Sequence, residues 1–230
     1  MVVFVFVVVC AFLDGNYDDL LKDKDVQIVY VGNLHVVRRT IGEKCLNAGK
    51  HVLLEKPFAM SYDDALYLIN LAKEKNLFIM EGMWTRFFPA VEQARRLALG
   101  SNSDKTSITA SEEGNSDGRS SSGGIIGEIV SVISEFNFNA SDSDEYPTSF
   151  FYNRKLGGGA SYLVGPYPFA AATLFFNGAE PDTIKVVGQV DEQTGVDLQA
   201  ALIMTFPPTS SIPPAMDSNN ETENTAKLPG

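Results

Sequence analysis

Short apolar runs alternate with amphipathic segments over the first hundred residues of the chain. The apolar runs are Val26–Val31, Val52–Leu54 and Leu77–Met80. Their length and their β-branched and aromatic residues are typical of buried parallel strands. The segments that precede and separate them, Asn16–Lys24, Val36–Ala48 and Ser61–Lys75, are predicted to be helices. A regular alternation of strands and helices predicts parallel βα units joined by right-handed crossovers.

Two of these predicted helices carry clear end signals. Ser61 is a good N-cap, and Asp63 and Asp64 follow it in the first turn, where the helix dipole favours acidic residues. Gly49 comes directly after the helix predicted at 36–48, in the C′ position that glycine often fills. The strand predicted at 52–54 is therefore bounded by a helix on each side.

The second half of the chain has a different pattern. An amphipathic helix is predicted at 90–99, and the Ser-, Gly-, Asn- and Asp-rich residues 100–124 predict a flexible insertion. Beyond the insertion, the pattern predicts a turn and an alternating strand within 125–139, then an apolar helix at 167–176 after three glycines. Two paired strands follow at 184–189 and 200–206, and the polar residues 207–230 predict a disordered tail.

The first thirteen residues are almost wholly apolar and allow three interpretations. A signal peptide is poorly supported, because no basic residue precedes the apolar run. The run is also shorter than the roughly 20 residues that a membrane-spanning helix needs. Its β-branched and aromatic residues suit a buried strand. The third interpretation is that residue 1 is not the natural start of the domain.

Charge and composition exclude several classes of partner. The net charge of −11 argues against a nucleic-acid partner and against an anionic membrane surface, since both require basic residues. Two cysteines, Cys10 and Cys45, make no disulfide framework, and two histidines, His35 and His51, do not supply a zinc site. We expect no bound metal and a reducing, cytoplasmic location.

A charged pair follows the strand predicted at 52–54. Glu55 and Lys56 stand at the carboxyl end of this strand, and Pro57 restricts the backbone behind them. Ligands of open parallel sheets bind beyond the carboxyl ends of the strands. Lys56 is therefore a candidate for chemistry, and a surface turn with two charges is the alternative that spacing leaves open.

Two motifs together resemble a known family. They are Gly-Lys-His-Val-Leu-Leu-Glu-Lys-Pro at 49–57 and Glu-Gly-Met-Trp-Thr-Arg-Phe-Phe-Pro at 81–89. With Val-Tyr-Val-Gly at 29–32, they resemble the glucose–fructose oxidoreductase / inositol dehydrogenase (Gfo/Idh/MocA) family. Within it, they are most similar to the branch of dimeric dihydrodiol dehydrogenases and NADP-dependent D-xylose 1-dehydrogenases. The resemblance is good over residues 15–99 and looser over 125–206.

The resemblance implies an α/β fold in which a Rossmann domain with a parallel sheet precedes an α+β domain. The second domain of the family contains a mostly antiparallel, open sheet used for substrate binding and dimerisation. The implied function is an NADP- or NAD-dependent oxidoreductase that oxidises a sugar hemiacetal, such as that of D-xylose, or a vicinal diol, such as trans-1,2-dihydrobenzene-1,2-diol. A homodimer is the implied assembly.

The resemblance also assigns site residues by position. Tyr167 corresponds to the base that takes the hydroxyl proton, and Lys56 to the charge that favours its phenolate. The cofactor-binding positions are Gly32, His35, Glu55, Lys56 and Pro57, and the substrate side is Trp84 and Arg86. Ordinary core packing is the alternative for Trp84 and Phe87, and a buried tyrosine at a helix start is the alternative for Tyr167.

The chain departs from the family pattern at several points. It contains no Gly-x-Gly-x-x-Gly loop, Arg38 replaces a histidine and Leu163 replaces an aspartate. We therefore expect residues 1–86 to form an incomplete Rossmann domain without its first βαβ unit, with residues 1–9 docked as a substitute strand. Residues 87–206 then form the substrate domain, which lacks the final strands and helix of the family. This interpretation predicts weak or no NADP(H) binding and impaired activity, and a non-catalytic binding or dimer-interface protein is the alternative.

Overall fold

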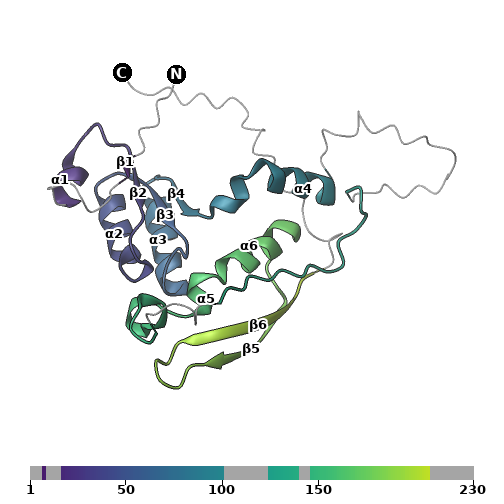
Figure 1. Ribbon diagram of the computed structural model, residues 1–230. Coiled ribbons are helices and arrows are strands. Elements are labelled where there is room, and N and C mark those ends of the chain that lie inside the picture. The colour runs from purple at the N-terminus through teal and green to yellow at the C-terminus, as the bar shows by residue number, and fades with distance from the viewer. Residues whose placement is uncertain (1–6, 9–16, 101–123, 140–145, 208–230) are drawn as a thin grey trace.

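A parallel sheet and its helices form the first part of the protein. The computed structural model describes residues 7–8, 17–100, 124–139 and 146–207. Four strands lie in the sequential order β1 (Val7–Val8), β2 (Ile28–Val31), β3 (His51–Glu55) and β4 (Ile79–Gly82), all parallel (Figure 1). The helices between them are α1 (Tyr17–Lys22), α2 (His35–Asn47) and α3 (Tyr62–Glu74).

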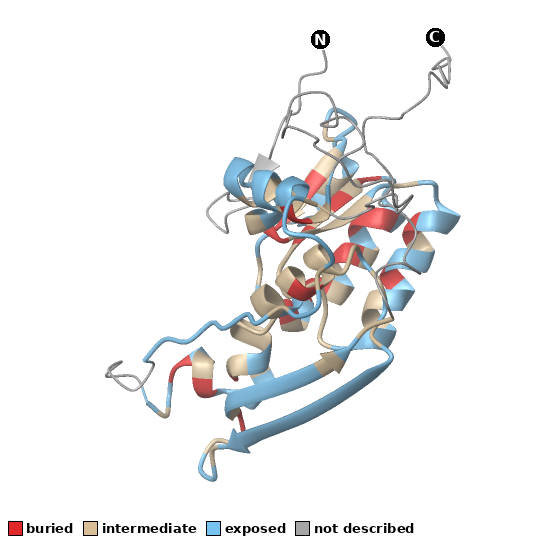
Figure 2. Cartoon of the chain, turned by 90° about the vertical axis from the view of Figure 1, so that its right-hand side faces the viewer, coloured by how far each residue is buried: buried red, intermediate tan, exposed pale blue. Residues whose placement is uncertain are grey.

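The core lies between this sheet and its helices. Alternate residues of β2 and β3 are buried, as expected where one face of a strand is covered. The buried cluster consists of Val29, Val31, Cys45, Leu46, Val52, Leu54, Leu68 and Ala72. Its members come from β2, β3, α2 and α3, so these two helices cover the same face of the sheet. Figure 2 shows buried residues in this part of the chain and further ones in the second part.

The structure confirms the local predictions for this part. All three predicted strands and all three predicted helices are present, with bounds shifted by a few residues. The Ser61 hydroxyl caps α3 by accepting from the backbone N–H of Asp64. Gly49 has the left-handed φ of 75° that a C′ glycine adopts after a helix. The predicted docking of the amino-terminal run is confirmed for Val7–Val8, which pair with β2, and its other residues lie outside the described ranges.

The second part of the protein consists of short helices and an antiparallel hairpin. A 3₁₀ turn η1 (Trp84–Phe87) leads into α4 (Pro89–Leu99). Later elements are the 3₁₀ turns η3 (Phe150–Tyr152) and η4 (Arg154–Leu156), the helices α5 (Ala160–Leu163) and α6 (Pro166–Phe175), and the strands β5 (Thr183–Val190) and β6 (Asp197–Thr205). β5 and β6 pair antiparallel, as predicted, and both are exposed along almost their whole length (Figure 2).

The prediction of a strand within residues 125–139 is wrong. The segment is described, but it forms no strand, and its one bridge joins Gly124 to Gly127 in a tight turn. The alternating aromatic residues have another cause. Phe136 packs on the ring of Tyr167, and Phe138 packs on Phe151. The alternation therefore reflects ring contacts with helical elements and not a sheet.

Three further predictions concern an insertion, a tail and a domain boundary. The insertion predicted at 100–124 and the tail at 207–230 lie almost wholly outside the described residues. The boundary predicted at residue 86 falls inside η1, and the division into domains 1–86 and 87–206 stays a prediction.

Candidate active site

The turn after β3 brings Lys56 to the second part of the protein. β3 is held on both sides by β2 and β4, and its carboxyl end leads directly into Lys56 and Pro57. The Lys56 ammonium donates a hydrogen bond of 2.7 Å to the carbonyl oxygen of Leu163, in α5. The same nitrogen lies 4.8 Å from the centroid of the Tyr167 ring. The two residues assigned to proton transfer are therefore in contact.

Tyr167 stands in the first turn of α6 and has two aromatic neighbours. The indole Nε1–H of Trp84 donates a hydrogen bond of 3.0 Å to the Tyr167 hydroxyl. The ring of Phe136 stacks on that of Tyr167 with centroids 5.1 Å apart and planes 13° apart. Trp84 is 56% exposed and Phe87 is 65% exposed, so the interpretation of these two residues as ordinary core is wrong.

The helix that carries Leu163 is short and is held by a strand. α5 has four residues, and a carboxylate oxygen of Asp197 in β6 accepts a hydrogen bond of 2.7 Å from the backbone N–H of Ser161. A carboxylate at a helix N-terminus satisfies an orphan donor and complements the helix dipole. This contact anchors the Leu163 carbonyl opposite Lys56.

Arg86 and Glu55 are both engaged with neighbouring residues. Arg86 donates to the Thr173 hydroxyl and so ties η1 to α6. The Glu55 carboxylate accepts from the Tyr30 hydroxyl at 2.8 Å and from the backbone N–H of Lys56 at 3.0 Å. Glu55 therefore shapes its own turn, whereas the substrate contact of Arg86 stays a prediction.

His35 is the first residue of α2, which begins one residue before its predicted start at Val36. It is buried, its Nε2 bonds to the carbonyl oxygen of Gly157 at 2.8 Å, and its ring stacks on Tyr162. Burial lowers the pKa of His35, the hydrogen bond to Gly157 opposes this, and the charges of Arg38 and Lys56 lower it further. In these contacts His35 joins the two parts of the protein, and its cofactor role stays a prediction.

Glycine is required at position 157 for this junction. Gly157 has a φ of 76°, and a Cβ built on it would overlap Nε2 of His35. The backbone at position 157 can therefore approach His35 this closely only if the residue is glycine, which has no side chain. This gives a structural reason for the first of the three consecutive glycines, 157–159.

The sequence missed two groups that complete the site. Phe136 lies in the segment predicted as a strand, and the aromatic alternation of that segment is its only local signal. The sequence marks Leu163 only as a replacement for an aspartate, whereas in the structure its backbone carbonyl is the partner of Lys56. A carbonyl group carries no residue-type signal, so no sequence pattern could have found it.

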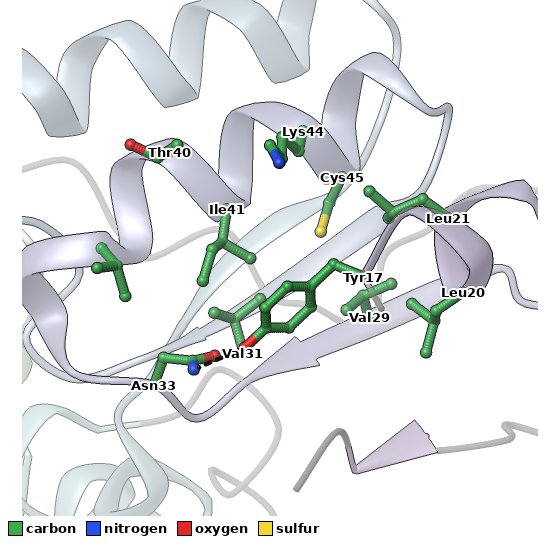
Figure 3. A pocket seen from close by; sticks show the side chains of 11 residues that line it. Tyr17, Leu20, Leu21, Val29, Val31, Asn33, Thr40, Ile41, Lys44 and Cys45 are labelled. Carbon is green, nitrogen blue, oxygen red and sulfur yellow. Dashed lines mark hydrogen bonds between the residues drawn. The ribbon is translucent and has the colours of Figure 1, made fainter. Parts of the chain in front are cut away.

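A cavity of about 430 Å³ lies elsewhere on the sheet, between α1, β2 and α2. Figure 3 shows that apolar side chains of these elements line it, and that Asn33 donates to the Tyr17 hydroxyl at its edge. Neither Lys56 nor Tyr167 lines it. The candidate catalytic residues therefore lie at the carboxyl end of β3 and not in this cavity.

The described residues contain neither a cluster of metal ligands nor a membrane-spanning helix. Among these residues, no cluster of three or more His, Cys, Asp or Glu side chains is placed to hold a metal ion. None of the helices in the described ranges is long and apolar enough to cross a membrane.

The arrangement around Tyr167 suits proton transfer. The Lys56 ammonium lies beside the Tyr167 ring, and the Trp84 indole donates to the Tyr167 hydroxyl. The group stands beyond the carboxyl end of β3, where ligands of parallel sheets bind. The site can therefore hold a proton acceptor next to a bound ligand.

The sequence matches two family descriptions. Residues 6–83 match "Oxidoreductase family, NAD-binding Rossmann fold", and residues 121–212 match "GFO/IDH/MocA C-terminal domain". Among curated relatives, the trans-1,2-dihydrobenzene-1,2-diol dehydrogenase of Xenopus tropicalis is 33% identical over 192 residues, 84% of this chain and 49% of the relative. The human protein of that name is 31% identical over 193 residues, with the same coverage. The chain thus spans about half the length of the curated relatives it matches.

Solved structures share this fold. A 3-ketoreductase from Actinomadura kijaniata, in complex with NADP and TDP-benzene, has a TM-score of 0.58 at 26% identity and covers 83% of this chain and 50% of its own. An aldose-aldose oxidoreductase from Caulobacter crescentus, complexed with glycerol, also has a TM-score of 0.58, at 24% identity, with the same two coverages. The second likeness concerns the fold alone.

Proposed function

The chain belongs to the GFO/IDH/MocA family of NAD-binding oxidoreductases, and from this premise we propose that it acts as an NADP- or NAD-dependent dehydrogenase of vicinal diols or sugar hemiacetals. The observation that carries the proposal is the contact of Lys56 and Trp84 with Tyr167 at the edge of the sheet. The name of the curated relatives supports a diol, and D-xylose is the sugar to compare with it.

The residues at this edge fit a nicotinamide cofactor by the chemistry of their groups. Lys56 offers an ammonium donor, Tyr167 offers a phenol, and Gly32 leaves the loop after β2 without a side chain. The turn at Glu55–Pro57 and the loop at Gly32 are the segments that would hold the cofactor. When bound, the nicotinamide accepts the hydride that leaves the substrate carbon.

In the proposed reaction, Tyr167 takes the proton of the substrate hydroxyl as the carbon–oxygen double bond forms. Lys56 and Trp84 stabilise the phenolate that precedes this transfer, since one is a cation beside the ring and the other donates to its oxygen. Arg86 and the exposed indole of Trp84 contact the substrate, and the flat faces of Trp84 and Phe136 suit an aromatic or sugar ring.

The test is formation of NADPH from NADP and trans-1,2-dihydrobenzene-1,2-diol, with D-xylose as the second substrate. We expect turnover that falls by about 10²–10⁴-fold in Tyr167→Phe, the usual contribution of a general base. Tyr162→Phe is the matched control, since Tyr162 donates to the Met60 carbonyl, away from the Tyr167 hydroxyl. Turnover that Tyr167→Phe leaves unchanged would contradict the assignment of the base. A fluorescence titration with NADPH measures the affinity of the chain for the cofactor, which is predicted to be weak, independently of turnover.

The hairpin supports a second proposal, a homodimer. The exposed large apolar residues of β5 and β6 are Ile184, Val186, Val187, Val190, Leu198, Leu202 and Ile203. By the strand register, Ile184, Val186 and Leu202 lie on one face of the hairpin and Val187 and Ile203 on the other, so both faces expose apolar side chains. Exposed apolar surface is typical of an interface. Analytical ultracentrifugation of the chain tests this, and Val187→Lys should shift a dimer towards the monomer. A monomer at all concentrations would contradict the proposal.

A further inference from the structure

The turn that carries Lys56 is held by side chains from three elements. The backbone groups concerned are the carbonyls of Glu55 and Pro57 and the N–H groups of Lys56 and Phe58. Arg38 Nη1 donates to the Glu55 carbonyl at 2.7 Å and to the Pro57 carbonyl at 2.6 Å. A Glu81 carboxylate oxygen accepts from Phe58 N–H at 2.9 Å, and the Glu55 carboxylate accepts from Lys56 N–H at 3.0 Å.

From this arrangement we propose that Arg38 and Glu81 are positioning residues that hold the Glu55–Phe58 turn and so fix Lys56 against Tyr167. The proposal rests on the proposed function, because it assigns Lys56 a role in proton transfer. Arg38 comes from α2, which covers one face of the sheet, and Glu81 comes from β4, the strand that pairs with β3.

Arg38 makes the more important contact, because one atom bridges the two carbonyls that flank Lys56. The residue is only 5% exposed, and an arginine buried to this extent is costly unless its hydrogen bonds offset the lost hydration. Burial lowers the pKa of Arg38, and the negative charge of Glu55 nearby opposes that change. A hydrogen bond from a charged donor is also stronger than a neutral one.

The bridge limits where the Lys56 side chain can point. With both neighbouring carbonyls fixed, the backbone of Lys56 has one orientation, and Nζ reaches the Leu163 carbonyl and the Tyr167 ring. Without the bridge, the turn can rotate, and Lys56 leaves Tyr167 for solvent. Arg38 and Glu81 would touch neither substrate nor cofactor, and they would act only through Lys56.

The variants that test this are Arg38→Met, Arg38→Lys and Glu81→Met. Arg38→Met keeps the apolar stem and removes the bridge, whereas Arg38→Lys retains a donor and should recover part of the loss. The matched control is Arg39→Met on the same helix, because Arg39 pairs with Glu43 and lies over Tyr67, on the outer surface.

The first readout is steady-state kinetics with the diol and NADP. In Arg38→Met we expect kcat to fall by about 10²-fold, the scale of a misplaced catalytic group, with KM for the diol within about twofold. Arg39→Met should match the unmodified chain. A loss confined to KM, or no loss at all, would overturn the inference.

The second readout does not need activity. Acetic anhydride labels lysine amines, and mass spectrometry gives the rate at Lys56, with the exposed Lys73 as internal reference. We expect Lys56 to be labelled several times faster in Arg38→Met than in the unmodified chain, because its hydrogen bond to Leu163 is lost. An unchanged rate in a folded variant overturns the inference.

Two other outcomes are also decisive. If Arg38→Met does not fold, Glu81→Met decides by the same labelling, because it removes the acceptor of the Phe58 N–H group, and an unchanged rate overturns the inference. If the unmodified chain shows no turnover, the proposed function fails, and the labelling alone supports or overturns the positioning role.

Discussion

The Lys56 ammonium donates a hydrogen bond to the carbonyl oxygen of Leu163, a residue 107 positions further along the chain. This bond joins the end of a parallel strand to a short helix of the second part, next to the ring of Tyr167. The site is therefore built at the junction of two regions that differ in their sequence patterns.

Removal of the Lys56 charge should impair the reaction more than it impairs folding. In Lys56→Met, we expect kcat/KM for the diol to fall by about 10²–10³-fold, comparable to the loss of one donor that stabilises a developing charge. Circular dichroism should show an unchanged fold. Lys73→Met, on the exposed face of α3, is the control and should retain full activity. Equal losses in the two variants would contradict the role of Lys56.

The indole N–H of Trp84 should act through the Tyr167 oxygen. Trp84→Phe keeps an aromatic ring and removes the hydrogen bond of 3.0 Å. A hydrogen bond to a charged group is worth about 1.5–3 kcal/mol, so we expect kcat to fall by about 10–10²-fold. In a Tyr167→Phe background the same change should have almost no further effect, because the acceptor is gone. Additive losses in the double variant would show that Trp84 acts independently.

The buried His35 should make stability depend on pH. Its pKa in the folded protein is lowered from the ordinary 6.5, chiefly by burial, so the unfolded chain binds a proton there more readily. The free energy of unfolding should therefore fall as the pH drops below 6.5 towards the folded pKa. His35→Gln, which retains a donor for the Gly157 carbonyl, should flatten this part of the profile.

Urea unfolding at a series of pH values measures this effect. His51, the other histidine of the chain, is present in both proteins, so the difference between their profiles belongs to His35. Identical slopes below pH 6.5 would disprove the contribution of His35.

Lys50 should contribute to stability and not to catalysis. It is buried, and its ammonium donates to the carbonyl oxygens of Asp23 and Val26, which fixes the chain just before β2. Lys50→Met leaves two carbonyls without this donor and should lower the free energy of unfolding by about 1–3 kcal/mol. The exposed Lys22→Met should lower it by less than about 1 kcal/mol, since its pair with Asp19 is on the surface. Equal effects in urea unfolding would contradict this account.

The sequence by itself determined the parallel sheet and its two long helices. The burial of four strand residues, Val29, Val31, Val52 and Leu54, can be predicted because short apolar runs are recognisable in the local sequence. The helix cap at Ser61 is recognisable locally in the same way. Lys56 and Trp84 lie in the two motifs, Tyr167 is assigned by position from the family resemblance, and the structure brings all three together.

Only the tertiary structure decided which groups surround them. Phe136 alternates like a strand residue but stacks on Tyr167, and His35 begins a helix and packs against Gly157. Arg38 looks like any helix arginine, yet it bridges two carbonyls of the Lys56 turn. These contacts join residues that are distant in sequence and often use backbone atoms, whose positions depend on packing and leave no local pattern.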